Sequence, residues 1–114
     1  MFGSSIIDYQ LTQVKLGRMA VLIQAGRQFA YAVARMMGKG GGRAEAAMVK
    51  AYVCKAAEWV TREAMQIHGG MGYAEEFTVS RLFVDARVLS IFEGADETLC
   101  LKVIARRLCD NATT

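Results

Sequence analysis

The sequence predicts an all-α protein, and three observations support this. Proline is absent from all 114 residues, so nothing interrupts a long helix from within. Hydrophobic residues make up 54% of the chain, and their excess lies in Ala and Met, which favour helix over sheet. Glycine-rich stretches divide the apolar pattern into a helix, a second helix, a short helix and a last helix.

The first predicted helix covers about Ser5 to Met37, with Ser4 or Ser5 as its cap. A helix of roughly 30 residues is about 45 Å long. A compact chain of this size has a radius of gyration of about 13 Å, so we expect the helix to extend beyond its own domain and need a partner. Its apolar residues form two stripes: Ile7, Leu11, Val14, Leu22, Phe29, Val33 and Met36; and Ile6, Leu16, Ala20, Ile23, Ala30, Ala34 and Met37.

The glycines of residues 38–42 end this helix. They lack the order G-x-x-x-x-G-K-[ST], so a flexible connection explains them better than a phosphate-binding loop. A second helix is predicted from about Ala44 to Ile67. The small residues on its inner side would allow close packing of helices, and this side carries Ala47, Met48, Ala51, Cys54, Ala57, Val60, Ala64 and Ile67.

The second half of the chain predicts two shorter helices. One lies around Val79 to Val88, with Thr78 or Ser80 as its cap. After an irregular stretch over residues 90–95, a last helix runs from about Asp96 to Leu108, with acidic residues at its positive end.

Composition excludes several classes of function. The net charge is +3, and the basic residues are spread along the chain without the dense patches that bind nucleic acid. The three cysteines, Cys54, Cys100 and Cys109, lack metal-binding spacing, so we expect no zinc site or disulfide framework. Reduced thiols suit a bacterial cytoplasm or a mitochondrial matrix. No apolar run reaches the roughly 20 residues of a membrane span.

Glu93 is the first candidate for chemistry. It follows two large apolar residues and precedes a glycine, at the start of a helix. Burial there would raise the pKa of its carboxyl group from the free value of about 4.3, which suits a general base. The alternative is a solvated loop carboxylate, and spacing alone favours that alternative.

Two other polar positions have simpler explanations. His68 is the only histidine and ends the second predicted helix, so a capping or core role is favoured over catalysis. Arg81 and Asp85 are four residues apart on one helix and predict an ion pair.

Four motifs occur in the order and spacing of a known family. The chain resembles the acyl-CoA dehydrogenases, whose pattern is approximately Q-I-x-G-G-x-G-Y, R-x-x-R-D-A-K, I-Y-E-G-T-x-E/Q and I-A-R. Upstream, an F-G…Q…L-x-x-M opening is also similar. The matching segments are residues 66–73 (QIHGGMGY), 81–87 (RLFVDAR), 91–97 (IFEGADE) and 104–106 (IAR), with Phe2, Gly3, Gln10, Leu16 and Met19 in the opening.

The resemblance implies a fold and a reaction. Residues 1–114 would form the C-terminal antiparallel four-helix bundle of such an enzyme, with the N-terminal helical and middle β-domains absent. The whole enzyme would use FAD to convert an acyl-CoA thioester to a trans-2-enoyl-CoA, whereas this chain alone would be inactive. Its partners would be the acyl-CoA substrate, an electron-transferring flavoprotein as electron acceptor, and further copies in a dimer or tetramer.

The resemblance also implies roles for individual residues. Glu93 would remove the α-proton as the catalytic base, and its backbone N–H would hold the thioester carbonyl. Phe92 and Gly94 would lie against the substrate. No metal is implied. The implied cofactor-binding residues are Gln66, Gly69 and Gly70, which would contact the dinucleotide part of a neighbour's FAD, and Ala95 and Glu97.

Three positions depart from the family pattern, and two alternative functions stay open. Ala95 replaces the usual Thr and so removes a hydroxyl near the flavin, Val84 replaces an Arg, and Phe92 replaces a Tyr. The alternatives are a helical assembly module with the fold but no activity, and a domain of an acyl-CoA oxidase.

Overall fold

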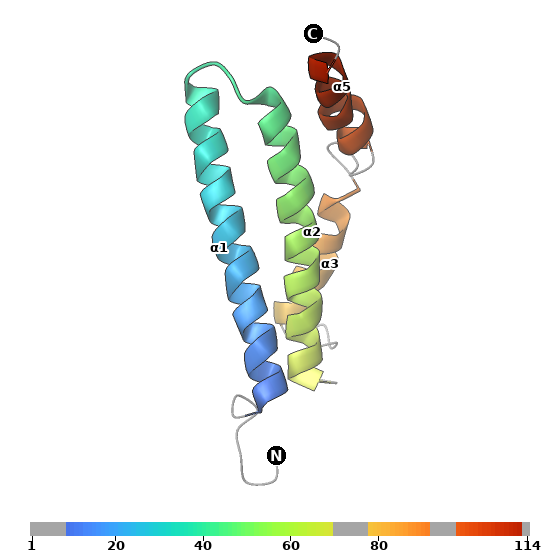
Figure 1. Ribbon diagram of the computed structural model, residues 1–114. Helices are drawn as coiled ribbons and strands as arrows, with labels where there is room; N and C mark the ends of the chain where they lie inside the picture. The colour runs from blue at the N-terminus through green and yellow to red at the C-terminus, as the bar shows by residue number, and fades with distance from the viewer. Residues whose placement is uncertain (1–8, 70–77, 92–97, 113–114) are drawn as a thin grey trace.

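The structure, a computed structural model, describes residues 9–69, 78–91 and 98–112. Every regular element in these ranges is helical, which confirms the all-α prediction (Figure 1). The elements in chain order are α1 (Gln10–Gly38), α2 (Arg43–His68), α3 (Thr78–Leu89), the π-helix η3 (Leu99–Ala105) and α5 (Arg106–Ala112).

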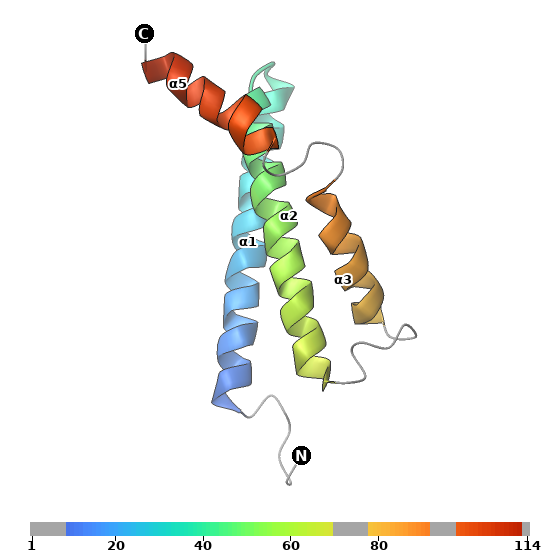
Figure 2. The same ribbon diagram turned by 90° about the vertical axis from the view of Figure 1, so that its right-hand side faces the viewer.

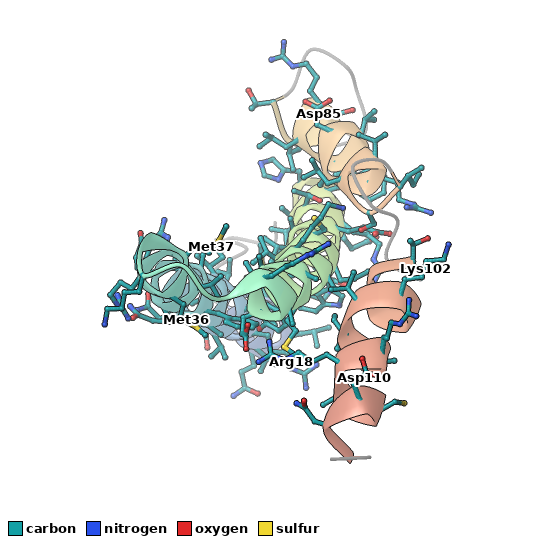
Figure 3. All side chains as sticks on the ribbon, turned by 90° about the horizontal axis from the view of Figure 1, so that it is seen from above. Arg18, Met36, Met37, Asp85, Lys102 and Asp110 are labelled. Atoms are coloured by element: carbon teal, nitrogen blue, oxygen red, sulfur yellow. The ribbon has the colours of Figure 1, made fainter. Side chains whose placement is uncertain are left out.

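Helix α2 is the centre of the molecule. Helices α1 and α3 pack on it from different sides (Figure 3), and α1, α2 and α3 run in alternating directions (Figure 1). The element η3 also packs on α2 and continues directly into α5. The predicted antiparallel four-helix arrangement is therefore confirmed. Its fourth helix, η3 with α5, crosses the start of α2 at a steep angle instead of running along α2 (Figure 2).

The turn between α1 and α2 requires its glycines. Gly40 and Gly42 have φ angles of 90° and 86°, which residues with a Cβ rarely adopt. A Cβ at Gly42 would also lie 3.1 Å from the Cβ of Met36. The backbone N–H groups of Lys39 and Gly41 donate to the carbonyl of Met36, at 3.0 and 3.1 Å, and so satisfy the end of α1. The predicted helix connection is confirmed.

The core consists of small side chains. Gly26 lets α1 approach α2, and the rings of Phe29 and Tyr52 meet edge to face at 6.4 Å between centroids. On the predicted inner side of α2, Ala47 and Cys54 are buried and the other residues are half-buried. The buried apolar residues of the described ranges are Val33, Ala44, Ala47, Cys54 and Ala86.

Helix α1 leaves most of its apolar surface uncovered. Val33 is buried and Phe29 half-buried against α2, but Leu11 is 72% exposed and Val21 is 67% exposed. The molecule measures 63 × 26 × 25 Å and has a radius of gyration of 17.7 Å, larger than the value of about 13 Å for a compact chain of this length. The molecule is thus elongated, with α1 lying along α2; that the first helix projects beyond its own domain stays a prediction.

The predicted start of the first helix was wrong, whereas α3 (Thr78–Leu89) agrees with the predicted range of about Val79 to Val88 and differs only in its cap. Helix α1 begins at Gln10 rather than Ser5, because Tyr9 is extended (φ −81°, ψ 132°) and no side chain caps the helix. Ser4 and Ser5 lie outside the described residues. In α3, Thr78 and Ser80 are the first and third helical residues, so neither is the cap. Apolar spacing locates a helix but does not mark its first residue.

The prediction of the last helix was wrong in its helix type and in its end. Residues Leu99–Ala105 form a π-helix, and the helix continues to Ala112 instead of ending at Leu108. A π-turn takes up an extra residue, which a search for the 3.6-residue period does not register. The predicted acidic start at Asp96 and Glu97 lies outside the described residues.

Candidate functional site

The end of α2 carries two of the predicted cofactor-binding residues. Gln66 is exposed on the last turn, and Gly69 follows the helix with φ 70° and ψ −149°. The Gly69 N–H donates to the Gln66 carbonyl, and the space where a Cβ would stand is open. An exposed amide beside an uncovered backbone can hydrogen-bond a polar ligand that approaches this end. The described residues therefore fit a cofactor contact here.

His68, between these two residues, makes a local hydrogen bond. Its Nδ1 atom donates to the carbonyl of Ala64, 2.7 Å away and one turn earlier in α2. The ring is exposed, and the bond satisfies one of the carbonyl groups near the helix end. This supports the capping role that was favoured for the histidine.

The end of α3 is bound to α2 by two charged contacts. The Lys50 Nζ atom donates to the Leu89 carbonyl at 2.8 Å. Two residues earlier in α3, the Arg87 Nε atom lies 3.7 Å from an oxygen of Glu58. These contacts hold the last turn of α3, immediately before the segment that contains Glu93. Residue spacing does not single out Lys50, because one lysine within a helical pattern indicates neither a contact nor a site.

The predicted ion pair between Arg81 and Asp85 was wrong. Both side chains are exposed, and no ion pair joins them in the described part of the chain. Exposed pairs four residues apart contribute little, so solvation of both charges competes well with pairing. The carboxylate that α3 contacts is Glu58 of α2, which sequence spacing does not reveal.

Gln66 and the end of α3 lie at different levels of α2. Lys50, which contacts Leu89, and Gln66 are sixteen positions apart on one continuous helix. At 1.5 Å per residue this separates them by about 24 Å. The structure thus does not bring Gln66 next to Leu89, which precedes Glu93 by four residues. The remaining predicted site residues lie outside the described ranges: Gly70, Phe92, Glu93, Gly94, Ala95 and Glu97.

An apolar groove runs between α1 and α2. The groove has a volume of about 380 Å³, and the apolar pattern of the sequence does not predict it. Gly26 and the alanines opposite it leave this space, because they have little or no side chain to fill it. The groove is lined by Leu22, Ile23, Gly26, Arg27, Ala30, Tyr31, Val53, Ala56, Ala57, Val60 and Thr61.

A second hollow, of about 360 Å³, is basic and lies between the start of α2 and the last helix. Arg43, Lys102 and Arg106 line it. At its edge, Arg107 is 3.1 Å from both carboxylate oxygens of Glu45.

The thiols and carboxylates of the described ranges form no metal site. Cys54 is buried and Cys109 is exposed, and both are free thiols. No group of three or more His, Cys, Asp or Glu side chains gathers within residues 9–69, 78–91 and 98–112. None of the helices in these ranges combines the length and the apolar character that a membrane crossing requires.

The sequence profile described as "Acyl-CoA dehydrogenase, C-terminal domain" matches residues 1–109. The chain belongs to the acyl-CoA dehydrogenase family. The resemblance seen in its motifs is therefore confirmed.

Individual acyl-CoA dehydrogenase relatives agree in sequence and fold. The (2S)-methylsuccinyl-CoA dehydrogenase of Cereibacter sphaeroides is 43% identical over 110 residues, which are 96% of this chain and 20% of that protein. The caffeyl-CoA reductase–Etf complex subunit CarC of Acetobacterium woodii is 35% identical over 97 residues, covering 84% of this chain and 26% of that one. The solved structure of butyryl-CoA dehydrogenase from Megasphaera elsdenii superposes with a TM-score of 0.91 at 35% identity.

The match covers only part of each acyl-CoA dehydrogenase relative. It spans 96% of this chain but 28% of the butyryl-CoA dehydrogenase chain, and smaller shares of the two other relatives. The chain thus corresponds to about a fifth to three-tenths of their length.

Proposed function

We propose that this chain is the C-terminal domain of an FAD-dependent acyl-CoA dehydrogenase and carries its catalytic base, Glu93. One observation carries the proposal. The family profile matches residues 1–109, and within that match the segment IFEGADE places a glutamate at the family's I-Y-E-G-T position. A helical module that had lost its chemistry would have no need of this carboxylate.

The proposed reaction is the α,β-dehydrogenation of an acyl-CoA thioester. The Glu93 carboxylate takes the α-proton, and the C–H electron pair becomes the new Cα–Cβ double bond. The β-hydrogen leaves as a hydride, for which FAD, when bound, is the acceptor. The backbone N–H of Glu93 donates to the thioester carbonyl and stabilises the enolate-like charge, while Phe92 and Gly94 flank the substrate. The product is a trans-2-enoyl-CoA.

In this proposal, one chain contacts two FAD molecules. Gln66 and Gly69, with Gly70, would contact the dinucleotide part of a neighbouring copy's FAD. Ala95 and Glu97 would contact the flavin at the chain's own base. The separation of about 24 Å between Gln66 and the α2 residue beside Leu89 supports this division.

A domain role explains the open surfaces. The uncovered apolar face of α1 and the groove beside it are typical of an element that packs against something else. We assign that covering surface to N-terminal helical and middle β-domains, which would complete the acyl-CoA pocket, and to further copies in a dimer or tetramer. The chain alone is then inactive.

The electron acceptor and the compartment follow from relatives and composition. One relative is named as a subunit of a complex with Etf, which supports an electron-transferring flavoprotein as the partner. Free thiols at Cys54 and Cys109 suit a bacterial cytoplasm or a mitochondrial matrix.

A chimera tests the proposed function. In it, this chain replaces the corresponding part of the Megasphaera elsdenii butyryl-CoA dehydrogenase, which shares its fold. The visible absorption of the flavin is recorded before and after addition of butyryl-CoA. Bleaching in the chimera and its loss in Glu93→Gln support the proposal, whereas equal bleaching in Glu93→Gln contradicts it.

The isolated chain provides the complementary measurement. We expect no retained FAD and no bleaching when an acyl-CoA is added. Bound flavin that bleaches in the isolated chain would show a working enzyme and contradict the domain assignment.

A further inference from the structure

We infer that Lys50 is a positioning residue for the catalytic base, because its ammonium group holds the end of α3, from which the chain leads to Glu93. This inference rests on the proposed function of Glu93. It adds a residue from the middle of α2 that the motifs of the sequence do not include.

The contact between Lys50 and Leu89 joins two helices across 39 residues of sequence. The Nζ atom lies 2.8 Å from the Leu89 carbonyl oxygen at the end of α3. The last carbonyl groups of a helix have no partner within it and carry its negative partial charge. A lysine ammonium supplies both a donor and an opposite charge, so it stabilises the helix end at this position.

A second set of contacts fixes the same end. Arg87 lies 3.7 Å from Glu58 of α2, and the Ile91 N–H donates to the Val88 carbonyl at 2.9 Å to close the last turn. Ser90, between them in this turn, is only 5% exposed. The chain therefore leaves α3 from a turn packed on α2, three residues before Glu93.

The position at which the chain leaves α3 matters because a general base must reach the proton that it removes. A displacement of about 1 Å at a reacting group can lower the rate about 100-fold. Helix α2 is long and continuous, so it is a rigid support for the end of α3. Loss of the Lys50 contact should consequently lower the rate of proton removal more than it weakens substrate binding.

Three variants isolate this role. Lys50→Met keeps an unbranched side chain that matches the lysine stem and removes the charge and the donors, whereas Lys50→Arg keeps the charge and the donors. Lys15→Met is the matched control, because it removes a lysine of α1 that lies 3.2 Å from Glu63 of α2 and has no contact with the end of α3 in the described residues. Far-ultraviolet circular dichroism checks that each variant keeps its helix content.

Amide hydrogen exchange of the whole 114-residue chain gives a readout without cofactor. Lys50→Met should speed exchange at residues 89–91 by about 5-fold or more, since a hydrogen bond from a charged group is lost. Lys50→Arg should restore protection, and Lys15→Met should leave these amides unchanged. Unchanged exchange in Lys50→Met, or an equal increase along all helices, would overturn the inference.

Flavin reduction in the loaded chimera gives the second readout. Lys50→Met should lower kcat about 10-fold or more with a change in KM below about 3-fold, and Lys50→Arg should recover most of kcat. The FAD content should not change. Normal turnover in Lys50→Met beside an inactive Glu93→Gln would refute the positioning role alone. Normal turnover in Glu93→Gln would refute the proposed function itself.

Discussion

Gly26 of α1 faces Val53 of α2 so closely that a methyl group on the glycine would touch the valine Cγ2 atom at 3.5 Å. That distance is an ordinary van der Waals contact, so a methyl group fits at this position. The glycine is buried, within an uninterrupted helix. The close approach of Gly26 to Val53 sets the distance between α1 and α2 at this point.

Gly26→Ala should therefore stabilise the chain. Alanine is better than glycine in a helix interior by about 1 kcal/mol, and here its methyl group meets Val53 without overlap. Urea unfolding followed by circular dichroism measures the change. Gly17→Ala is the control, because a Cβ at that position meets nothing within 4 Å and reports propensity alone.

A larger side chain at the same position should have the opposite effect. The branched side chain of Gly26→Leu would begin 3.5 Å from Val53 Cγ2 and 3.9 Å from Tyr52 Cε1, so it would have to turn into the groove that Gly26 lines or push the helices apart. We expect a loss of about 1–3 kcal/mol in unfolding free energy. A Gly26→Leu variant as stable as Gly26→Ala would mean that the α1–α2 interface is not packed as described.

The ion pair between Arg107 and Glu45 fastens α5 to α2. Both distances are 3.1 Å, but the arginine side chain is 49% exposed, so solvent screens the pair. Arg107→Ala should cost about 0.5 kcal/mol and expose α5 to limited proteolysis. High salt should produce the same sensitivity in the unaltered chain. Equal cleavage of both proteins at low salt would exclude this role.

Exposed apolar residues on α1 should cause the isolated chain to self-associate. Val21 is 67% exposed, so Val21→Asp should reduce association without loss of helix content. Gln28→Asp adds the same charge at an exposed polar position of α1 and should leave association unchanged. Sedimentation velocity measures the outcome. A monomeric unaltered chain would remove the basis for this prediction.

Glu93 has a test that depends on its chemistry. In the flavin-loaded chimera, Glu93→Gln should reduce the rate of bleaching by at least about 100-fold, because the amide cannot take up the α-proton. Glu93→Asp should retain part of the rate, with a shorter reach to the same proton. Stopped-flow absorption measures both rates. A rate for Glu93→Gln close to that of the unaltered chimera would show that the carboxylate is not the base.

The helices could be predicted because they depend on local features of the sequence, namely apolar spacing and the positions of glycines. Glycines mark the turn after α1, and small residues such as Ala47 and Cys54 mark the packed side of α2. The start of the first helix was harder to predict, because no side chain caps α1 and the helix begins after the extended residue Tyr9. The π-helix was missed because its extra residue leaves the apolar pattern readable as an ordinary helix.

Contacts between helices are the part that spacing could not supply. Arg87 pairs with Glu58 and not with a neighbour on its own helix, and Lys50 meets a backbone carbonyl 39 residues away. Such contacts depend on how two helices are placed side by side. The motifs still located Gln66 and Gly69 at an exposed helix end, where a ligand can reach them.

The glycine turn between α1 and α2 also has a kinetic consequence. It joins two long antiparallel helices, so the contacts next to the turn link residues close in sequence, whereas Lys15 and Glu63 at the open end are 48 positions apart (Figure 1). The contacts next to the turn require little loop closure and form rapidly. The α1–α2 hairpin should thus be the folding nucleus. During synthesis it would be complete before α3 leaves the ribosome and docks on the exposed side of α2.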